Sequence, residues 1–71
     1  AMEIGGTMPT VLNAANEIAV EKFLHEKINF LDIPVLIEKT MQAYTVKQEY
    51  TLEDLLQADA WARTYARTIV L

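Results

Sequence analysis

The sequence predicts an all-α fold, a small helical bundle of three helices in one domain. Apolar residues recur at spacings of three and four residues in three separate segments, which is the period of an amphipathic helix. A helix-start signal precedes each segment. No segment alternates apolar and polar residues clearly enough to indicate a strand, and residues 44–50 do so only loosely. The 71 residues can form one domain at most, and 52% of them are hydrophobic.

The first predicted helix spans residues 9–26. Two glycines (residues 5–6) break the chain before it, Thr7 or Thr10 is expected to cap it, and Pro9 is tolerated in a first turn. At about 100° of rotation per residue, one face of this helix is expected to lie against the core, and it carries Leu12, Ala15, Ala19, Val20 and Phe23. Val11 and Ile18 widen this face. The side chains expected to point away from it are Asn13, Glu17 and Glu21.

The second predicted helix begins with Asp32 as its N-cap and has Pro34 in its first turn. Leu31 and Leu36 occupy the two positions of a hydrophobic staple around that cap. The expected apolar stripe consists of Ile33, Leu36, Ile37, Met41 and Tyr44. The mixed, polar residues 45–50 that follow are expected to form a loop.

The third predicted helix follows a capping box, in which Thr51 is the N-cap and Asp54 stands three residues later, and runs toward Val70. One expected stripe consists of Leu52, Leu55, Leu56, Ala62, Ala66 and Val70, and it is extended round the helix by Ala58, Trp61, Tyr65 and Ile69. An ordinary surface helix needs an apolar stripe of only about 100°. The excess predicts a contact with something besides the two other helices.

Composition excludes several classes of site and partner. With no cysteine, the chain has no disulfide framework and no thiolate metal site. Its net charge of −4 argues against nucleic acid or an anionic membrane as partner, because both require a basic surface. No apolar run approaches the roughly 18 residues of a membrane span, and the first residues lack the order of a signal peptide.

Few side chains are candidates for chemistry. His25 is the only histidine, and with Glu21 as its nearest helical neighbour it is interpreted as a surface residue rather than a metal ligand. Asp59 and Arg63 stand four residues apart within the apolar stripe of the third helix. Such a pair can be a catalytic acid held by a cation, but a partly buried helical ion pair is favoured.

Three further features have a structural and a functional interpretation. Asn16 falls among apolar neighbours, so it is expected to be buried and to bind loop backbone rather than substrate. The segment 5–7 could bind an anion at exposed amides, but it matches no phosphate-binding motif and is interpreted as a turn. Trp61 and Tyr65 are expected to pack rather than to stack on bases. No catalytic, cofactor-binding or metal-ligating residue is therefore predicted in this chain.

Three stretches resemble one enzyme family. Residues 5–20, GGTMPTVLNAANEIAV, look like the "GGT-x-P-x-VLNAANE-x-AV" signature of the 1-deoxy-D-xylulose 5-phosphate reductoisomerase family. Residues 30–34, FLDIP, with the LIE of residues 36–38, resemble its next helix start. Residues 52–63, LEDLLQADAWAR, are similar to its final helix. The first stretch is highly specific, and the other two alone are only indicative.

The resemblance implies a parent enzyme that converts 1-deoxy-D-xylulose 5-phosphate to 2-C-methyl-D-erythritol 4-phosphate in non-mevalonate isoprenoid biosynthesis. It also implies NADPH on an N-terminal domain and Mg²⁺ or Mn²⁺ on a central domain, which a C-terminal four-helix bundle braces. None of the family's metal, phosphate or cofactor motifs has a counterpart here, so no catalytic residue is carried over. The implied location is the bacterial cytoplasm, or the plastid of a plant or alga.

The resemblance also implies that residues 1–71 are a fragment, the C-terminal helical bundle domain of a multidomain enzyme. Residues 1–4 are then expected to be the last turn of a truncated fourth helix. Its loss should leave an apolar groove through which the fragment self-associates, and the remaining domains of the parent are the other expected partners. The alternative hypothesis is a free-standing helical protein–protein interaction module. An autonomous small enzyme would need catalytic groups that the sequence lacks.

Overall fold

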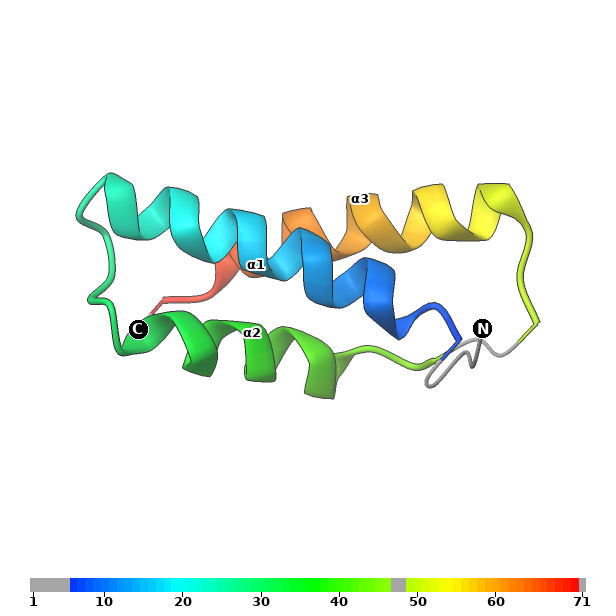
Figure 1. Cartoon of the computed structure of the whole chain (residues 1–71), viewed down its shortest axis with the longest axis horizontal. Helices are drawn as coiled ribbons and strands as arrows, with labels where there is room; N and C mark the ends of the chain where they lie inside the picture. The colour runs from blue at the N-terminus through cyan, green and yellow to red at the C-terminus, as the bar shows by residue number, and fades with distance from the viewer. Residues whose placement is uncertain (1–5, 47–48, 71) are drawn as a thin grey trace.

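The computed structural model describes residues 6–46 and 49–70 and confirms the all-α prediction (Figure 1). The helices are α1 (Met8–Leu24), α2 (Asp32–Ala43) and α3 (Leu52–Thr68), and the described residues include no strand. α1 packs extensively against both other helices, whereas α2 and α3 contact each other much less. α1 is therefore the central element. The predicted last turn of a fourth helix, residues 1–4, lies outside the described residues.

The start of α1 is anchored to the end of α2. Gly6 has φ 51°, a left-handed conformation that glycine adopts without steric cost. Thr7 is the N-cap residue, but its backbone is already helical and its side chain makes no capping hydrogen bond. The Thr7 hydroxyl, fully buried, instead shares a 2.8 Å hydrogen bond with the Tyr44 hydroxyl. The predicted side-chain cap by Thr7 or Thr10 is thus wrong, because the Thr7 hydroxyl is hydrogen-bonded to Tyr44 instead of to the first turn of α1.

The buried face of α1 is rotated from the predicted one. Its buried residues are Val11, Ala14, Ala15, Ile18 and Ala19. Leu12, Val20 and Phe23, which were expected to face the core, are 43%, 37% and 36% exposed. The reason is that α1 is packed on two sides, against both α2 and α3. The side of α1 that lies between α2 and α3 is buried, and the apolar residues outside this side remain exposed to solvent.

α1 ends at Leu24, two residues before the predicted end. Glu26 has φ 60°, which turns the chain away from the helix axis. The Lys27 amide donates to the Lys22 carbonyl at 2.8 Å, and the Glu26 amide donates to the Phe23 carbonyl at 3.0 Å. This pair of bonds is a Schellman motif with glutamate in the position that glycine usually occupies. The motif stops the helix although the sequence offers no glycine.

α2 begins at Asp32, so the prediction of Asp32 as N-cap is wrong by one position. The backbone of Leu31 is already helical, and the Asp32 carboxylate accepts a hydrogen bond from the Asn29 amide at 3.0 Å. Pro34 lies in the first turn as predicted. Leu36 is fully buried whereas Leu31 is 77% exposed, so the structure does not support the predicted staple between them.

α3 confirms the predicted capping box. The Asp54 amide donates to the Thr51 hydroxyl at 3.2 Å, and the Thr51 amide donates to the Asp54 carboxylate at 2.9 Å. The helix ends at Thr68 rather than Val70 because Ile69 is extended, and the Lys22 ammonium donates to the Ile69 carbonyl at 2.7 Å. A side chain of α1 therefore ties down the end of α3.

The core consists of two clusters of buried residues. One cluster joins α1, the α1–α2 connection, α2 and α3 and contains Ile18, Ala19, Ile28, Leu36 and Ala66. The other joins α1 to α3 and contains Val11, Ala14, Ala58 and Ala62. The three buried residues of α3 are alanines, and their small side chains let α3 approach α1 closely. The predicted leucines of that stripe, Leu52 and Leu56, are 72% and 63% exposed.

Candidate functional site

A charged bridge joins α1 to α3 on one side of the bundle. Arg63 Nε donates to Asp59 Oδ2 at 2.9 Å, and Arg63 Nη2 lies 2.8 Å from Glu17 Oε1. Asn13 Nδ2 donates to Glu17 Oε2 at 3.3 Å, which extends the network along α1. The pairing of Asp59 with Arg63 was predicted from their spacing. The participation of Glu17, which was expected to point away, was not predicted.

The Arg63 bridge is partly solvated rather than buried. The side chains of Arg63, Asp59 and Glu17 are 30%, 36% and 51% exposed. Hydrogen bonds to Asp59 and then to Glu17 raise the pKa of the Arg63 guanidinium above its ordinary value, so it is charged at every physiological pH. A cation that already holds two carboxylates is a structural clamp. Here the Arg63 clamp links α1 to α3 through Glu17 and Asp59.

The other polar candidates lie apart from one another. His25 is exposed at the end of α1, as predicted. In residues 6–46 and 49–70, no three side chains of the metal-ligating types lie close enough to hold an ion together. Among the same residues, no buried side-chain nitrogen or oxygen lacks a hydrogen-bond partner.

Asn16 is exposed, which corrects the prediction that it is buried. It lies with Pro9, Leu12 and Asn13 around a shallow hollow of about 490 Å³ on the outer side of α1. Its amide makes no side-chain hydrogen bond within the described part of the chain, so the predicted tie to a loop backbone is also wrong. The rotation of α1 that exposes Leu12 exposes Asn16 as well.

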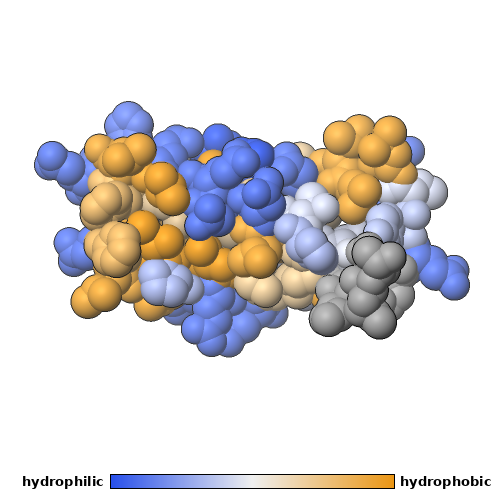
Figure 2. Space-filling view, viewed as in Figure 1, coloured by the Kyte–Doolittle hydropathy of each residue, from blue (hydrophilic) through white to orange (hydrophobic). Residues whose placement is uncertain are grey.

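Apolar side chains gather at the end of the molecule where α1 connects to α2. Leu24, Phe30 and Leu31 are 70%, 67% and 77% exposed, and the Phe30 ring meets the Phe23 ring edge-on with centroids 5.8 Å apart. Figure 2 shows this apolar end, and it shows apolar surface continuing along the line between α1 and α2. We name the residues at this end, Phe23, Leu24, Phe30 and Leu31, the apolar end patch.

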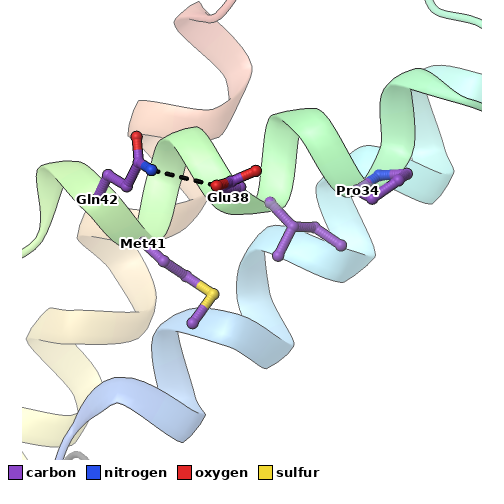
Figure 3. Close-up of a pocket in the computed structure, with 5 residues that line it drawn as sticks. Pro34, Glu38, Met41 and Gln42 are labelled. Carbon is purple, nitrogen blue, oxygen red and sulfur yellow. Dashed lines mark hydrogen bonds between the residues drawn. The ribbon is translucent and has the colours of Figure 1, made fainter.

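A second hollow, of about 450 Å³, lies on α2. Its lining residues are Pro34, Ile37, Glu38, Met41 and Gln42. Figure 3 shows Met41 extending from α2 toward α1, while Gln42 Nε2 donates to Glu38 Oε2 at 3.2 Å along the outer edge. The apolar part of this hollow thus faces the junction of α1 and α2, and its polar edge faces away from that junction.

The predicted packing role of Trp61 and Tyr65 is confirmed. Their rings are stacked, with centroids 5.0 Å apart and an interplanar angle of 11°. The ring centroids of Tyr44 and Trp61 lie 5.2 Å apart, with the two rings tilted by 46°. Tyr44 also holds Thr7, so this aromatic row joins the end of α2 to both α3 and the start of α1.

None of the described helices is both long and apolar enough to cross a membrane.

Comparison with known proteins identifies the family. A profile described as DXP reductoisomerase C-terminal domain matches residues 1–65. The chain belongs to this family. A 1-deoxy-D-xylulose 5-phosphate reductoisomerase from Chlorobium chlorochromatii is 56% identical over 70 residues, and one from Acetivibrio thermocellus is 54% identical over 70 residues. Both alignments cover 99% of this chain but only 18% of the relative. A Synechococcus relative of the same name is 61% identical over 83% of this chain and 15% of its own length.

The reductoisomerase signature maps onto α1 and onto the turn before it. Of the LNAANE segment, residues 12–17, two alanines are buried, while Leu12, Asn13, Asn16 and Glu17 are exposed. The segment therefore has a core side and a surface side, and its Glu17 reaches Arg63 of α3. In this reductoisomerase domain the signature builds the central helix, and its polar residues lie on the surface beside the charged bridge.

Proposed function

We propose that this chain is a non-catalytic structural domain of a 1-deoxy-D-xylulose 5-phosphate reductoisomerase. The parent enzyme would convert that substrate to 2-C-methyl-D-erythritol 4-phosphate with NADPH and Mg²⁺ or Mn²⁺. The proposal rests on the family match together with one structural observation, the apolar end patch. A small domain that leaves so much apolar surface open is expected to dock on another structure.

The first proposed partners are the remaining domains of the parent. The chain spans less than a fifth of the relatives it matches, 18% in each of the two named first, so most of such an enzyme lies outside it. NADPH and the metal would be held there. We also propose that the isolated chain self-associates through its exposed apolar surface. The proposed location of the parent is the cytoplasm of a bacterium, or a plastid.

The non-catalytic role is tested by following NADPH oxidation with substrate and Mn²⁺. The isolated chain is expected to show no turnover, and a full-length reductoisomerase that carries this domain is expected to be active. Turnover by the isolated chain would overturn the proposal.

The bracing role is tested in the full-length enzyme with Phe30→Glu, which places a charge in the apolar end patch. The matched control is Thr64→Glu, which places the same charge at an exposed position on α3. Phe30→Glu is expected to lower the melting temperature and activity together, because a docked patch cannot solvate the new carboxylate. Equal behaviour of the two variants would show that the patch is not docked in the enzyme.

A further inference from the structure

The large buried side chains of this domain lie in α1, α2 and the connection between them. We name this part, residues 8–43, the α1–α2 hairpin. Among the described residues, the buried hydrophobic side chains larger than alanine are Val11, Ile18, Ile28 and Leu36. The buried residues of α3 are Ala58, Ala62 and Ala66. Because the gain from burial grows with the apolar area removed from water, each buried residue of α3 contributes less than each large one of the hairpin.

Partly buried side chains around the core show the same asymmetry. α2 and its C-cap residue pack Ile33, Ile37, Met41 and Tyr44 against the two core clusters. α3 and its C-cap residue pack Trp61 and Ile69 against them. Two leucines near the start of α3, Leu52 and Leu56, are 72% and 63% exposed. α3 also contacts α2 much less than it contacts α1, so its attachment to the domain depends on α1.

Charged side chains join α3 to α1 at two places. Arg63 Nη2 lies 2.8 Å from Glu17 Oε1, and the Lys22 ammonium donates to the Ile69 carbonyl at 2.7 Å. α1 and α3 run in the same direction (Figure 1), so Lys22 lies at the C-terminal end of both helices, where a cation is favourable. Arg63 and Glu17 are 30% and 51% exposed, so salt screens the contact between them.

The α1–α2 hairpin has closing contacts of its own. The Schellman motif ends α1, and the Asn29 amide donates to the Asp32 carboxylate at 3.0 Å where α2 begins. At the other end of the hairpin, the hydroxyls of Thr7 and Tyr44 share a hydrogen bond of 2.8 Å. None of these contacts involves a residue of α3. All of them can therefore persist when α3 moves away from α1.

We infer that α3 opens from this domain as a unit while the α1–α2 hairpin stays folded, and that the contacts made by Arg63 and Lys22 are a salt-sensitive latch. Regions of one protein open with different free energies, in units that often coincide with supersecondary motifs. Opening α3 exposes three buried alanines and the side of α1 that they cover. Unfolding the hairpin also exposes Ile18, Ile28 and Leu36, so it costs more free energy.

The test is amide hydrogen exchange of the intact 71-residue chain, followed for each residue by NMR. Relative to intrinsic rates, the amides of residues 56–67 in α3 are expected to exchange at least about tenfold faster than the most protected amides of α1 and α2, which corresponds to about 1.4 kcal/mol. Equal protection of the three helices would overturn the inference. Higher protection in α3 than in the hairpin would overturn it as well.

Two substitutions distinguish a separate opening of α3 from unfolding of the whole domain. Ile28→Val weakens a contact that the open form keeps, so it should lower the protection of α1 and α2 and leave that of α3 unchanged. Arg63→Ala removes a contact that is absent from both the open and the unfolded form, so it should lower the protection of all three helices. If Ile28→Val lowered the protection of α3 as much as that of the hairpin, the domain would unfold only as a whole, and the inference would be wrong.

The latch is tested by repeating the exchange at 1 M salt, which should speed the exchange of α3 amides. Arg63→Ala should remove most of this salt dependence. The matched control is Arg67→Ala, which removes an exposed arginine of the same helix and should keep the salt dependence. A salt dependence that is the same in both variants would overturn the role of Arg63 in the latch. Circular dichroism is expected to show all three variants folded.

Discussion

Removing one arm of the Arg63 bridge should destabilise the domain measurably but mildly. In Asp59→Ala, Arg63 loses its hydrogen bond within α3 and keeps Glu17 on α1, 2.8 Å away. Because the two paired side chains are 30% and 36% exposed, the cost belongs to the range of solvated pairs, about 0.2–1 kcal/mol. The sequence alone allowed a larger cost of about 1–3 kcal/mol on the assumption of a buried pair, and the observed exposure removes that assumption.

Such a cost is large enough to measure in a domain of this size. A loss of 1 kcal/mol lowers the melting temperature of a 60–100-residue domain by about 4–8 °C, so a cost of about 0.2–1 kcal/mol should lower that of Asp59→Ala by about 1–8 °C. Arg63→Ala should cost more, because it removes both ion pairs and the packing of the aliphatic stem. The double variant of Asp59 and Glu17 should cost more than the sum of its single variants, because either carboxylate alone can still hold Arg63.

The assay is urea denaturation followed by circular dichroism, at low salt and at 1 M salt. High salt should reduce the difference between Asp59→Ala and the unchanged chain, because it screens solvated charges. A loss above about 3 kcal/mol for Asp59→Ala would refute this reasoning, since losses of that size come from desolvated pairs. An unchanged free energy of unfolding in Arg63→Ala would show that the bridge contributes nothing to the stability of the domain.

The bridge should also respond to pH in a defined direction. The folded-state pKa of Arg63 is raised above its ordinary value, by the hydrogen bond to Asp59 first and to Glu17 second. A raised pKa of a base contributes stability that is complete below the unfolded-state pKa and is lost as the pH rises through the folded-state value. The Arg63 contribution is therefore constant across physiological pH and is lost only in strongly alkaline solution.

Three further substitutions test the fold. Glu26→Gly should stabilise the domain by about 0.5–1 kcal/mol, because Glu26 has φ 60° at the helix end where glycine is unstrained, and thermal melting should show the gain. Leu36→Ala should cost about 2–5 kcal/mol of stability, because Leu36 is fully buried. A loss of that size is enough to unfold much of a small domain, so a native dichroism spectrum at 37 °C with unchanged melting would contradict this prediction. Thr51→Ala should cost about 1 kcal/mol through the lost capping box, and Thr64→Ala on the exposed side of α3 serves as its control.

Local signals in the sequence predicted the helices well. The capping box of Thr51 and Asp54 depends on two residues three apart, and the Asp59–Arg63 pair on two residues four apart. Both arrangements are fixed by helix geometry alone, so no knowledge of the tertiary fold was needed. The helix of α1 was predicted for the same reason, although its end was placed two residues late because the turn at Glu26 has no glycine to indicate it.

Contacts between distant residues could not be predicted. The hydroxyls of Thr7 and Tyr44 meet across 37 residues of sequence, and Lys22 reaches the Ile69 carbonyl across 47. Each depends on how α1 is rotated between its neighbours, and helical periodicity does not determine that rotation when the apolar arc is wide. The same uncertainty placed Asn16 inside the core, whereas the structure exposes it.

The composition of the core explains why so much apolar surface stays open. Of the ten buried hydrophobic residues among those described, the large ones are Val11, Ile18, Ile28 and Leu36, and the other six are alanines. Alanines allow the helices to approach closely, but each removes little apolar area from water, about 25 cal/mol for every Å². Larger apolar side chains remain in contact with water, because these residues are each more than 60% exposed: Leu24, Phe30, Leu31, Leu52 and Leu56.

Stability should therefore depend on what covers the exposed side chains. If a second copy covers them, binding to the folded state raises its stability by mass action, and the melting temperature of the isolated chain should rise with its concentration. A melting temperature independent of concentration in the unchanged chain would mean that this apolar surface stays uncovered in the isolated domain.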